Sequence, residues 1–150
     1  MRIFFPASMQ NIVEFSGKQA IMVQRGFVIT SEFAADQDEQ DVEVLEDAVL
    51  YCAGAASLEQ TQGDDARSSR LVIVADVPEQ DIHIVDAKQG SAEFIGETSM
   101  SWQRVVALFA DDVHGQEVIA GGGDPSDVSM MWFGPTEAQT LLESLGFSTA

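Results

Sequence analysis

Two adjacent aspartates and a histidine, Asp111, Asp112 and His114, are the residues of this chain best suited to chemistry. They follow directly after a run of apolar residues. Carboxylates and an imidazole can hold a divalent metal ion, which activates water for hydrolysis. Asp76 and Asp86 also lie at or just beyond the ends of β-type runs. One hypothesis is therefore a metal-assisted hydrolase that uses Asp76, Asp111, Asp112 and His114.

A structural role for the same residues is the stronger interpretation. Aspartate is favoured at strand ends because it bonds locally to the backbone and caps helices. The chain has two histidines, and their spacing matches neither H-x-x-x-H nor H-E-x-x-H. We therefore expect Asp111 or Asp112 to cap whatever follows the strand, and we assign no catalytic, cofactor-binding or metal-ligating residue.

Three other residue types could serve a ligand, and each has a simpler explanation. Trp102 and Trp132 could line a pocket, but their apolar neighbours favour packing in the core. Cys52 is the single cysteine, which excludes an internal disulfide and a multi-thiolate zinc site. Its apolar neighbours predict a buried, unreactive thiol. No cofactor is expected.

An acidic segment resembles a calcium-binding loop and a glycine-rich segment resembles a phosphate-binding loop, but neither matches its motif. The segment 36–47 has Asp at the first and third positions of a calcium loop, but Asp41 stands where the turn needs Gly and Asp47 where a bidentate Glu is expected. The segment 121–124, GGGD, lacks the lysine of a phosphate loop. The acidic residues of segment 36–47 are better explained by their position at the start of a helix. Segment 121–124 is better explained as a surface loop.

The net charge is −18, and it is unevenly distributed. No Lys or Arg occurs between Gly26 and Ala66 or from Val105 to the C-terminus. Because cationic side chains supply most of the affinity for phosphate backbones, direct binding of nucleic acid or of anionic lipid is disfavoured. The charge suits solubility, a basic protein partner or cation binding.

Short β-type runs alternate irregularly with helical patterns, which predicts an α+β fold. We expect a single domain over residues 1–150, with a mixed β-sheet of about five to six strands packed against two to four helices. A helix from Asp41 has two adjoining apolar stripes, which predicts a central position in the core. Residues 101–110 fit either a strand or a helix, and we favour a strand.

The longest apolar runs are much shorter than the ~20 residues of a membrane-spanning helix. The N-terminal segment MRIFFPAS has a run of three apolar residues directly before Pro6, too short for the hydrophobic region of a secretory signal. We therefore expect a cytoplasmic protein that does not enter a membrane.

Five segments, in order, carry a resemblance to a known family: MRIFFPAS, GFVIT with the acidic stretch and Ala-rich helix after it, LVIVADVP, WQRVVALFADD and MWFGPTEAQTLL. In this order they resemble a family of small actinobacterial proteins of unknown function. The resemblance covers most of the chain and implies a cytosolic bacterial protein with one intact domain. It carries no catalytic residue to transfer, and the GGGDPSD loop departs from the family pattern.

The function that these observations favour is binding to another protein, without catalysis. The partner is expected to be basic, and oligomeric state is left open. The metal-assisted hydrolase is the alternative, and it requires its carboxylates to converge. A second alternative is an acidic nucleic-acid mimic, which requires rows of carboxylates at phosphate-like separation.

Overall fold

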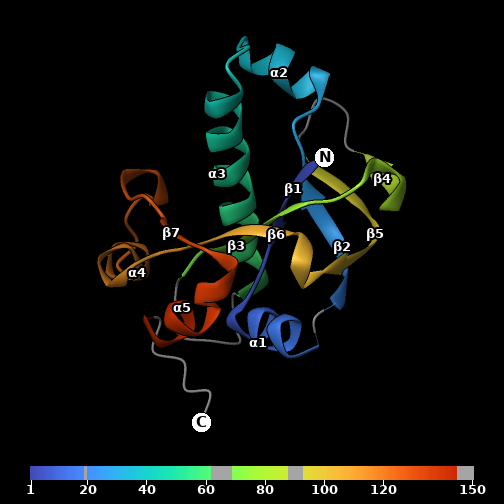
Figure 1. Cartoon of the computed structure of the whole chain (residues 1–150). Helices are drawn as coiled ribbons and strands as arrows, with labels where there is room; N and C mark the ends of the chain where they lie inside the picture. Colours follow the sequence, from blue (N-terminus) through green and yellow to red (C-terminus); the bar gives the residue numbers. More distant parts are fainter. Residues whose placement is uncertain (19, 62–68, 88–92, 145–150) are drawn as a thin grey trace.

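A computed structural model describes residues 1–18, 20–61, 69–87 and 93–144 of the chain. The strands form one seven-stranded sheet in the order β4-β5-β2-β1-β3-β6-β7, and helices lie on both of its faces (Figure 1). The α+β class and the single domain are confirmed. The expected mixed sheet of five or six strands is wrong in detail, since all six pairings of the described strands are antiparallel.

The strands are short and follow one another through turns and helices. They are β1 (Arg2–Pro6), β2 (Ala20–Phe27), β3 (Leu71–Asp76), β4 (Ile82–Ala87), β5 (Glu93–Ser101), β6 (Val105–Ala110) and β7 (Met131–Phe133). The α-helices are α1 (Met9–Lys18), α2 (Ser31–Gln37), α3 (Val42–Thr61), α4 (Val113–Ala120) and α5 (Ala138–Ser144). Single 3-10 turns occupy Glu79–Asp81, Trp102–Arg104, Pro125–Asp127 and Pro135–Glu137.

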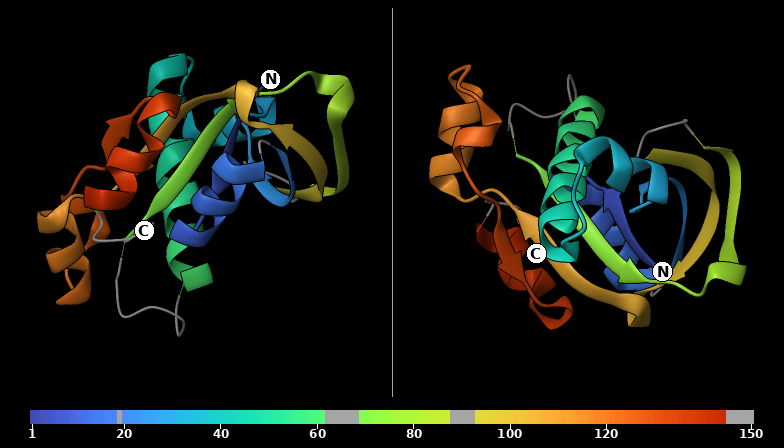
Figure 2. Two further views of the ribbon diagram at one scale, coloured as in Figure 1. Left: turned by 60° about the horizontal axis from the view of Figure 1, so that its bottom comes forward. Right: turned by 90° about the horizontal axis from the view of Figure 1, so that it is seen from above.

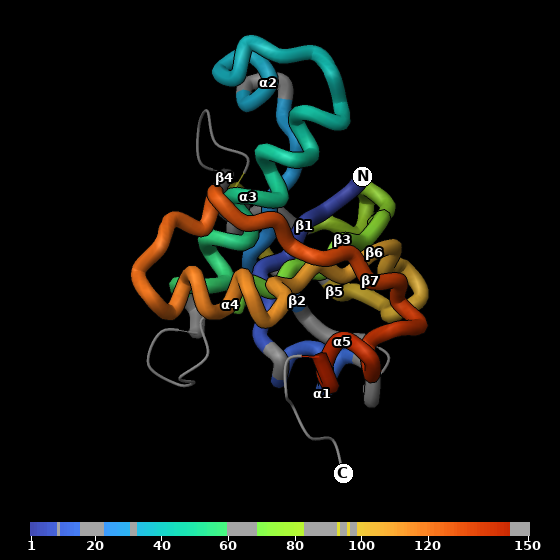
Figure 3. The backbone as a smooth tube through the Cα atoms, turned by 90° about the vertical axis from the view of Figure 1, so that its left-hand side faces the viewer, coloured from blue at the N-terminus to red at the C-terminus, as the bar shows by residue number. Residues whose placement is uncertain are grey.

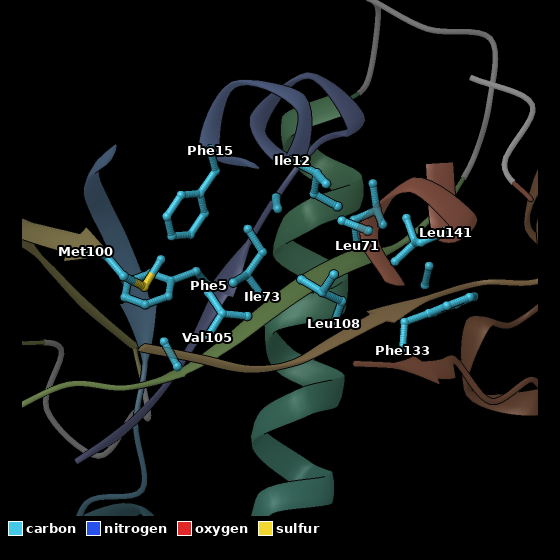
Figure 4. Close-up of a cluster of buried hydrophobic side chains, with 14 of the residues drawn as sticks. Phe5, Ile12, Phe15, Leu71, Ile73, Met100, Val105, Leu108, Phe133 and Leu141 are labelled. Carbon is cyan, nitrogen blue, oxygen red and sulfur yellow. The ribbon is translucent and has the colours of Figure 1, made fainter. Parts of the chain in front are cut away.

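The central strand β3 has apolar side chains on both faces, and each face builds its own core. Ile73 faces the cluster beneath α1 and α5, which also contains Phe15 and Leu141. Figure 4 shows this cluster with α3 behind the sheet. Val74 faces the second cluster, which α3 covers with Val49. Continuous burial along a β-branched run is typical of a strand covered on both sides.

The helices α1 and α5 are far apart in sequence but lie side by side over one face (Figures 1 and 3). In the left view of Figure 2, α1 stands in front of the strands and α3 behind them. Residues 105–110 form a strand, as predicted, and a 3-10 turn precedes it. The helix α2 was not predicted, because its seven residues are too few to show a helical period.

The long helix α3 begins where it was predicted, but its packing differs from the prediction. Leu45, Val49 and Ala53 are buried against the sheet. Val44 and Tyr51, from the adjoining apolar stripe, are 48% and 44% exposed. The expectation that both stripes enter the core is therefore wrong, because α3 lies on the outer surface and contacts the sheet along one side only.

The sequence of residues 113–120 predicts a short helix weakened by Gly115, and the structure forms one continuous helix there. The polar and small residues 60–69 predict a loop, and Gly146 predicts a helix end; most of the first segment and all of the second lie outside the described residues. Within the described ranges, no helix combines the length and apolar character needed to cross a bilayer.

Ser57 joins α3 to two strands in the buried interior. Its hydroxyl donates to the carbonyl oxygen of Ala7 at 2.7 Å and accepts from the amide of Leu71 at 3.0 Å. The side chain is completely buried, so water cannot replace either bond. The hydroxyl thus fixes the height of α3 along the sheet.

We predict that Ser57→Ala lowers the free energy of unfolding by about 1–3 kcal/mol, because the Leu71 amide loses its acceptor in a dry environment. Urea denaturation measures the change. Ser126→Ala, at an exposed turn, is the control and should change stability by less than about 0.5 kcal/mol. Equal effects of the two substitutions would contradict the role given to Ser57.

Candidate functional site

Asp111, the first candidate from the sequence, is half of a buried ion pair with Arg70. Arg70 Nη2 lies 2.7 Å from Asp111 Oδ1, and Nε lies 3.0 Å from Oδ2. The backbone amide of Arg70 also donates to Oδ2, at 2.8 Å. Both residues are at most 2% exposed. The bidentate geometry occupies both carboxylate oxygens, so Asp111 has a structural partner and no access to solvent.

The same ion pair lies where five parts of the fold meet. Arg70 precedes β3 and Asp111 follows β6, and Arg70 Nη2 also donates to the carbonyl oxygen of Val128 at 2.9 Å, ahead of β7. On α4, a Cβ at Gly115 would lie 3.0 Å from Asp111 Oδ1. On α3, a Cβ at Gly54 would lie 3.1 Å from Cδ of Arg70. The two glycines therefore let both helices approach the pair closely.

Asp112 caps the N-terminus of α4. The sequence predicted this role for either Asp111 or Asp112. The Asp112 side chain accepts a hydrogen bond from the amide of Gly115 at 2.7 Å. His114 is exposed in the first turn of that helix. The sequence neighbours Asp111 and Asp112 thus serve two separate structural purposes, and neither approaches a third acidic or imidazole ligand in the described chain.

Asp76 lies at the opposite end of β3 from Asp111. Because β3 and β6 are antiparallel, the residue after β6 sits beside the start of β3, and six residues of extended strand span about 20 Å. Asp76 is exposed and bonds Arg2 Nε at 3.0 Å. That hydrogen bond raises the pKa of Arg2 above its ordinary value, although partial burial opposes the shift. The structure does not bring Asp76 and Asp111 together, as the hydrolase hypothesis requires.

Asp86 lies on the edge strand β4 and pairs with Ile95 of β5, and four strands separate β4 from β6 in the order of the sheet. The aspartates that follow β-type runs therefore do not share one end of neighbouring strands. An antiparallel order causes this, since successive strand ends point in opposite directions.

The structure does form a cavity of about 240 Å³ on the face of the sheet that carries α3. Its floor crosses four strands, and its wall is the first half of α3. The lining residues are Arg2, Phe4, Glu46, Asp47, Leu50, Val74, Val106, Ala107, Phe109 and Trp132. We call this hollow the α3 groove.

Trp132 forms the rim of the α3 groove, and it is 60% exposed. It stands opposite Phe109 in the β6–β7 ladder. The prediction that Trp132 is packed in the core is therefore wrong. That Trp132 serves a ligand stays a prediction. Trp102 is half-buried and packs edge-on against Phe15, 4.8 Å between ring centroids, in the cluster on the other face. The two tryptophans do not share a site.

The charges that line the α3 groove are one cation and two carboxylates. The cation, Arg2, is already paired: it bonds Asp76 and lies 3.5 Å from Glu46. Asp47 is exposed on α3. Arg104 precedes β6 and is not one of the lining residues. The groove is consequently apolar at its floor and net negative at its wall.

Cys52 lies outside the α3 groove and is half-buried. Burial, and to a lesser extent the charge of Glu93, raises the pKa of its thiol. A raised pKa reduces the thiolate fraction at neutral pH, which supports the expected low reactivity.

Sequence reasoning missed Arg70 and the α3 groove. Arg70 gives a signal, because a charged residue stands directly before a strand that is apolar throughout. The groove gives none that is local: its floor residues come from β1, β3, β6 and β7, and only strand pairing assembles them.

We predict that Asp111→Ala lowers the free energy of unfolding by about 3–5 kcal/mol, since it leaves a buried guanidinium without its counter-charge. The neighbouring Asp112→Ala removes only a helix cap and should cost about 1 kcal/mol. Chemical denaturation of both variants checks the difference. A mild effect of Asp111→Ala, equal to that of its neighbour, would show that the ion pair does not organise the fold.

The sequence was compared with family models, with curated proteins and with solved structures. No curated protein and no solved structure matches it. One family model does, over residues 1–142. The likeness to a family of unknown function, inferred from short motifs, is thereby confirmed, and the actinobacterial source stays a prediction. Since the match spans nearly the full length, the chain belongs to the family of unknown function DUF6912.

Proposed function

We propose that this protein binds another protein, and that the α3 groove receives an extended segment of the partner that carries Lys or Arg beside an apolar side chain. The observation that carries the proposal is the exposure of Trp132 at the rim of an apolar hollow. A large aromatic side chain that is left in water beside a pocket is typical of the residues that dominate binding energy at protein interfaces.

The size of the hollow favours a partner's side chains over a free small molecule. At about 240 Å³, it is smaller than the roughly 300–1,000 Å³ that small-molecule sites commonly occupy. One or two apolar side chains would fill the floor between Phe4 and Phe109. The rest of the partner would remain outside, against Trp132.

The position of Trp132 favours an extended segment. It lies on β7, the last strand in the order of the sheet, so the outer edge of β7 has no neighbouring strand in the described chain. Backbone groups at such an edge can pair with an added strand. A segment lying along β7 would place alternate side chains toward the α3 groove.

Charge favours a basic segment. The wall residues Glu46 and Asp47 are acidic, and the groove's single cation is held by Asp76 and Glu46. The parts of the chain around α3 and from β6 onward contain no Lys or Arg. An approaching cation therefore meets carboxylates without a competing positive charge on α3 or β7.

The two alternative functions receive less support. The hydrolase requires converging carboxylates, and Asp76 and Asp111 lie at opposite ends of β3. The nucleic-acid mimic requires rows of carboxylates, whereas the exposed side of α3 alternates acids with Val44 and Tyr51. The mimic stays a prediction without an observation that favours it.

We place this binding in the cytoplasm, because the single cysteine is half-buried and cannot form an internal disulfide. Fractionation of cells of the source organism, followed by immunodetection, should recover the protein with the cytoplasmic fraction. Recovery in the medium or with the membranes would contradict this location.

The binding proposal is tested by selection from a displayed library of random peptides against the intact protein. We predict enrichment of peptides with Lys or Arg next to Leu, Ile or Phe, and affinities that fall steadily as salt rises from about 50 to about 500 mM, as the charge attraction is screened. Trp132→Ala should weaken the selected peptides by about tenfold or more, because it removes the rim of the groove.

Val113→Ala is the matched control, since Val113 is an equally exposed apolar residue on α4. It should leave the affinities unchanged. Selected peptides that are acidic, or that bind the Trp132 and Val113 variants equally well, would show that the α3 groove is not the docking site.

A further inference from the structure

The helix α3 has a second apolar surface, on the side that faces away from the sheet. Val44, Ala48, Tyr51 and Ala55 follow one another at intervals of four, three and four residues, and Leu58 continues the spacing. Val44, Tyr51 and Ala55 are exposed, while Ala48 is partly exposed and also packs against the core cluster beneath α3. Residues at this spacing form one stripe along a helix, as at the a and d positions of a coiled coil.

This surface, which we call the outer stripe, is distinct from the α3 groove. The groove is lined by Glu46, Asp47 and Leu50, on the flank of α3 toward β6 and β7. At 100° per residue, Val44 and Tyr51 point away from Leu45 and Val49, which enter the core. The same helix therefore offers its buried side to the sheet, one flank to the groove and a third side to solvent.

The outer stripe has the dimensions of a helix-docking surface. A helix of twenty residues is about 30 Å long at 1.5 Å per residue. Ala48 and Ala55 are small enough to let a second helix approach closely, and Tyr51 between them supplies a large amphipathic contact. No acidic residue interrupts the stripe from Val44 to Leu58.

The residues beside the outer stripe select the charge of the occupant. Asp47 flanks the outer stripe on the groove side, and Glu59 flanks it on the opposite side. Both positions are suited to ion pairs with Lys or Arg of a second helix. Glu59 is 71% exposed at its side chain, and its contact with Arg25 is long, at 3.8 Å. The helix contains no Lys or Arg. A second copy of α3 would therefore bring like charges together, and a helix with basic flanks would not.

We infer that the outer stripe of α3 binds an amphipathic helix of a partner protein, whose apolar seam is flanked by Lys or Arg. The apolar stripe gives the contact, and the carboxylates beside it give the preference for a basic helix. The two surfaces meet at Asp47, but neither Val44 nor Tyr51 lines the α3 groove, so the apolar contact of the outer stripe does not depend on the groove.

The test uses the intact protein and three synthetic peptides of about four heptads each. The first has Leu and Ile at a and d with Lys at e and g, the second replaces that Lys by Glu, and the third is a scrambled isomer of the first. Fluorescence anisotropy measures binding. The Lys heptad peptide should bind at least about tenfold more tightly than the other two.

The double variant Val44→Gln and Tyr51→Gln removes the apolar contact without changing the charge. It should weaken the Lys heptad peptide by at least about tenfold. Two controls should leave its binding unchanged: Val113→Gln, at an exposed position on α4, and Trp132→Ala, in the α3 groove. Loss in the Trp132 variant alone would assign the helix to the groove and overturn the inference.

Two further results would also overturn it. Equal binding of the Lys heptad peptide and its scrambled isomer would show attraction by charge alone. A dimer in sedimentation analysis that the double variant dissolves would make a second copy the occupant. If the double variant does not fold, as circular dichroism would show, Glu59→Gln replaces it, because Glu59 flanks the outer stripe and does not line the α3 groove. This substitution should weaken the Lys heptad peptide severalfold and reduce its salt dependence, and no change would contradict the inference.

Discussion

The buried ion pair between Arg70 and Asp111 is the interaction on which the arrangement of the fold depends most. Removing either charge would leave the other without water or a counter-ion. The pair therefore requires the start of β3 and the end of β6 to remain in contact. Through Val128 it also holds the segment that leads into β7, so the strand that carries Trp132 is positioned by a contact beside its own start, where Met131 pairs with Ala110.

This constraint separates a buried region from an open surface close to it. Around Asp111, the carboxylate, the guanidinium and two helices that approach through glycines pack together and exclude solvent. On the face that carries α3, Phe4, Phe109 and Trp132 line a hollow with acidic residues at its wall, which runs from Trp132, near the Asp111 end of β6, toward Arg2. The rigid packing thus supports the open surface beside it. Binding surfaces are commonly built in this way, with exposed side chains held by a well-packed scaffold.

Local patterns in the sequence predicted the elements, while their environment depended on pairing between distant strands. The periodicity of α3 predicted the helix, but both of its apolar stripes look alike in sequence, and only the position of α3 on the outside of the sheet decides that Val49 is buried and Tyr51 exposed. Similarly, the β-type character of Val105–Ala110 predicted a strand. Its antiparallel pairing with β3, which separates Asp111 from Asp76, has no local signal.

Among the candidate residues, too, some roles could be predicted from local sequence and others depended on contacts with distant parts of the chain. Asp112 caps a helix, which the residue type and position already indicated. Asp111 and Trp132 could not be assigned from their neighbours. Asp111 acquires its role from Arg70, forty-one positions earlier, and Trp132 is exposed because β7 lies at the edge of the sheet.

The most direct measurement is an NMR titration of the isotope-labelled protein with a basic, apolar peptide obtained by selection. The largest shifts should fall on the Trp132 indole and on the amides of Phe4, Asp47 and Phe109, while the amides of Arg70, Asp111 and Gly115 remain unchanged. Shifts centred on Asp112 and His114, or no saturable shifts at all, would contradict the assignment of binding to the α3 groove and of a structural role to the buried ion pair.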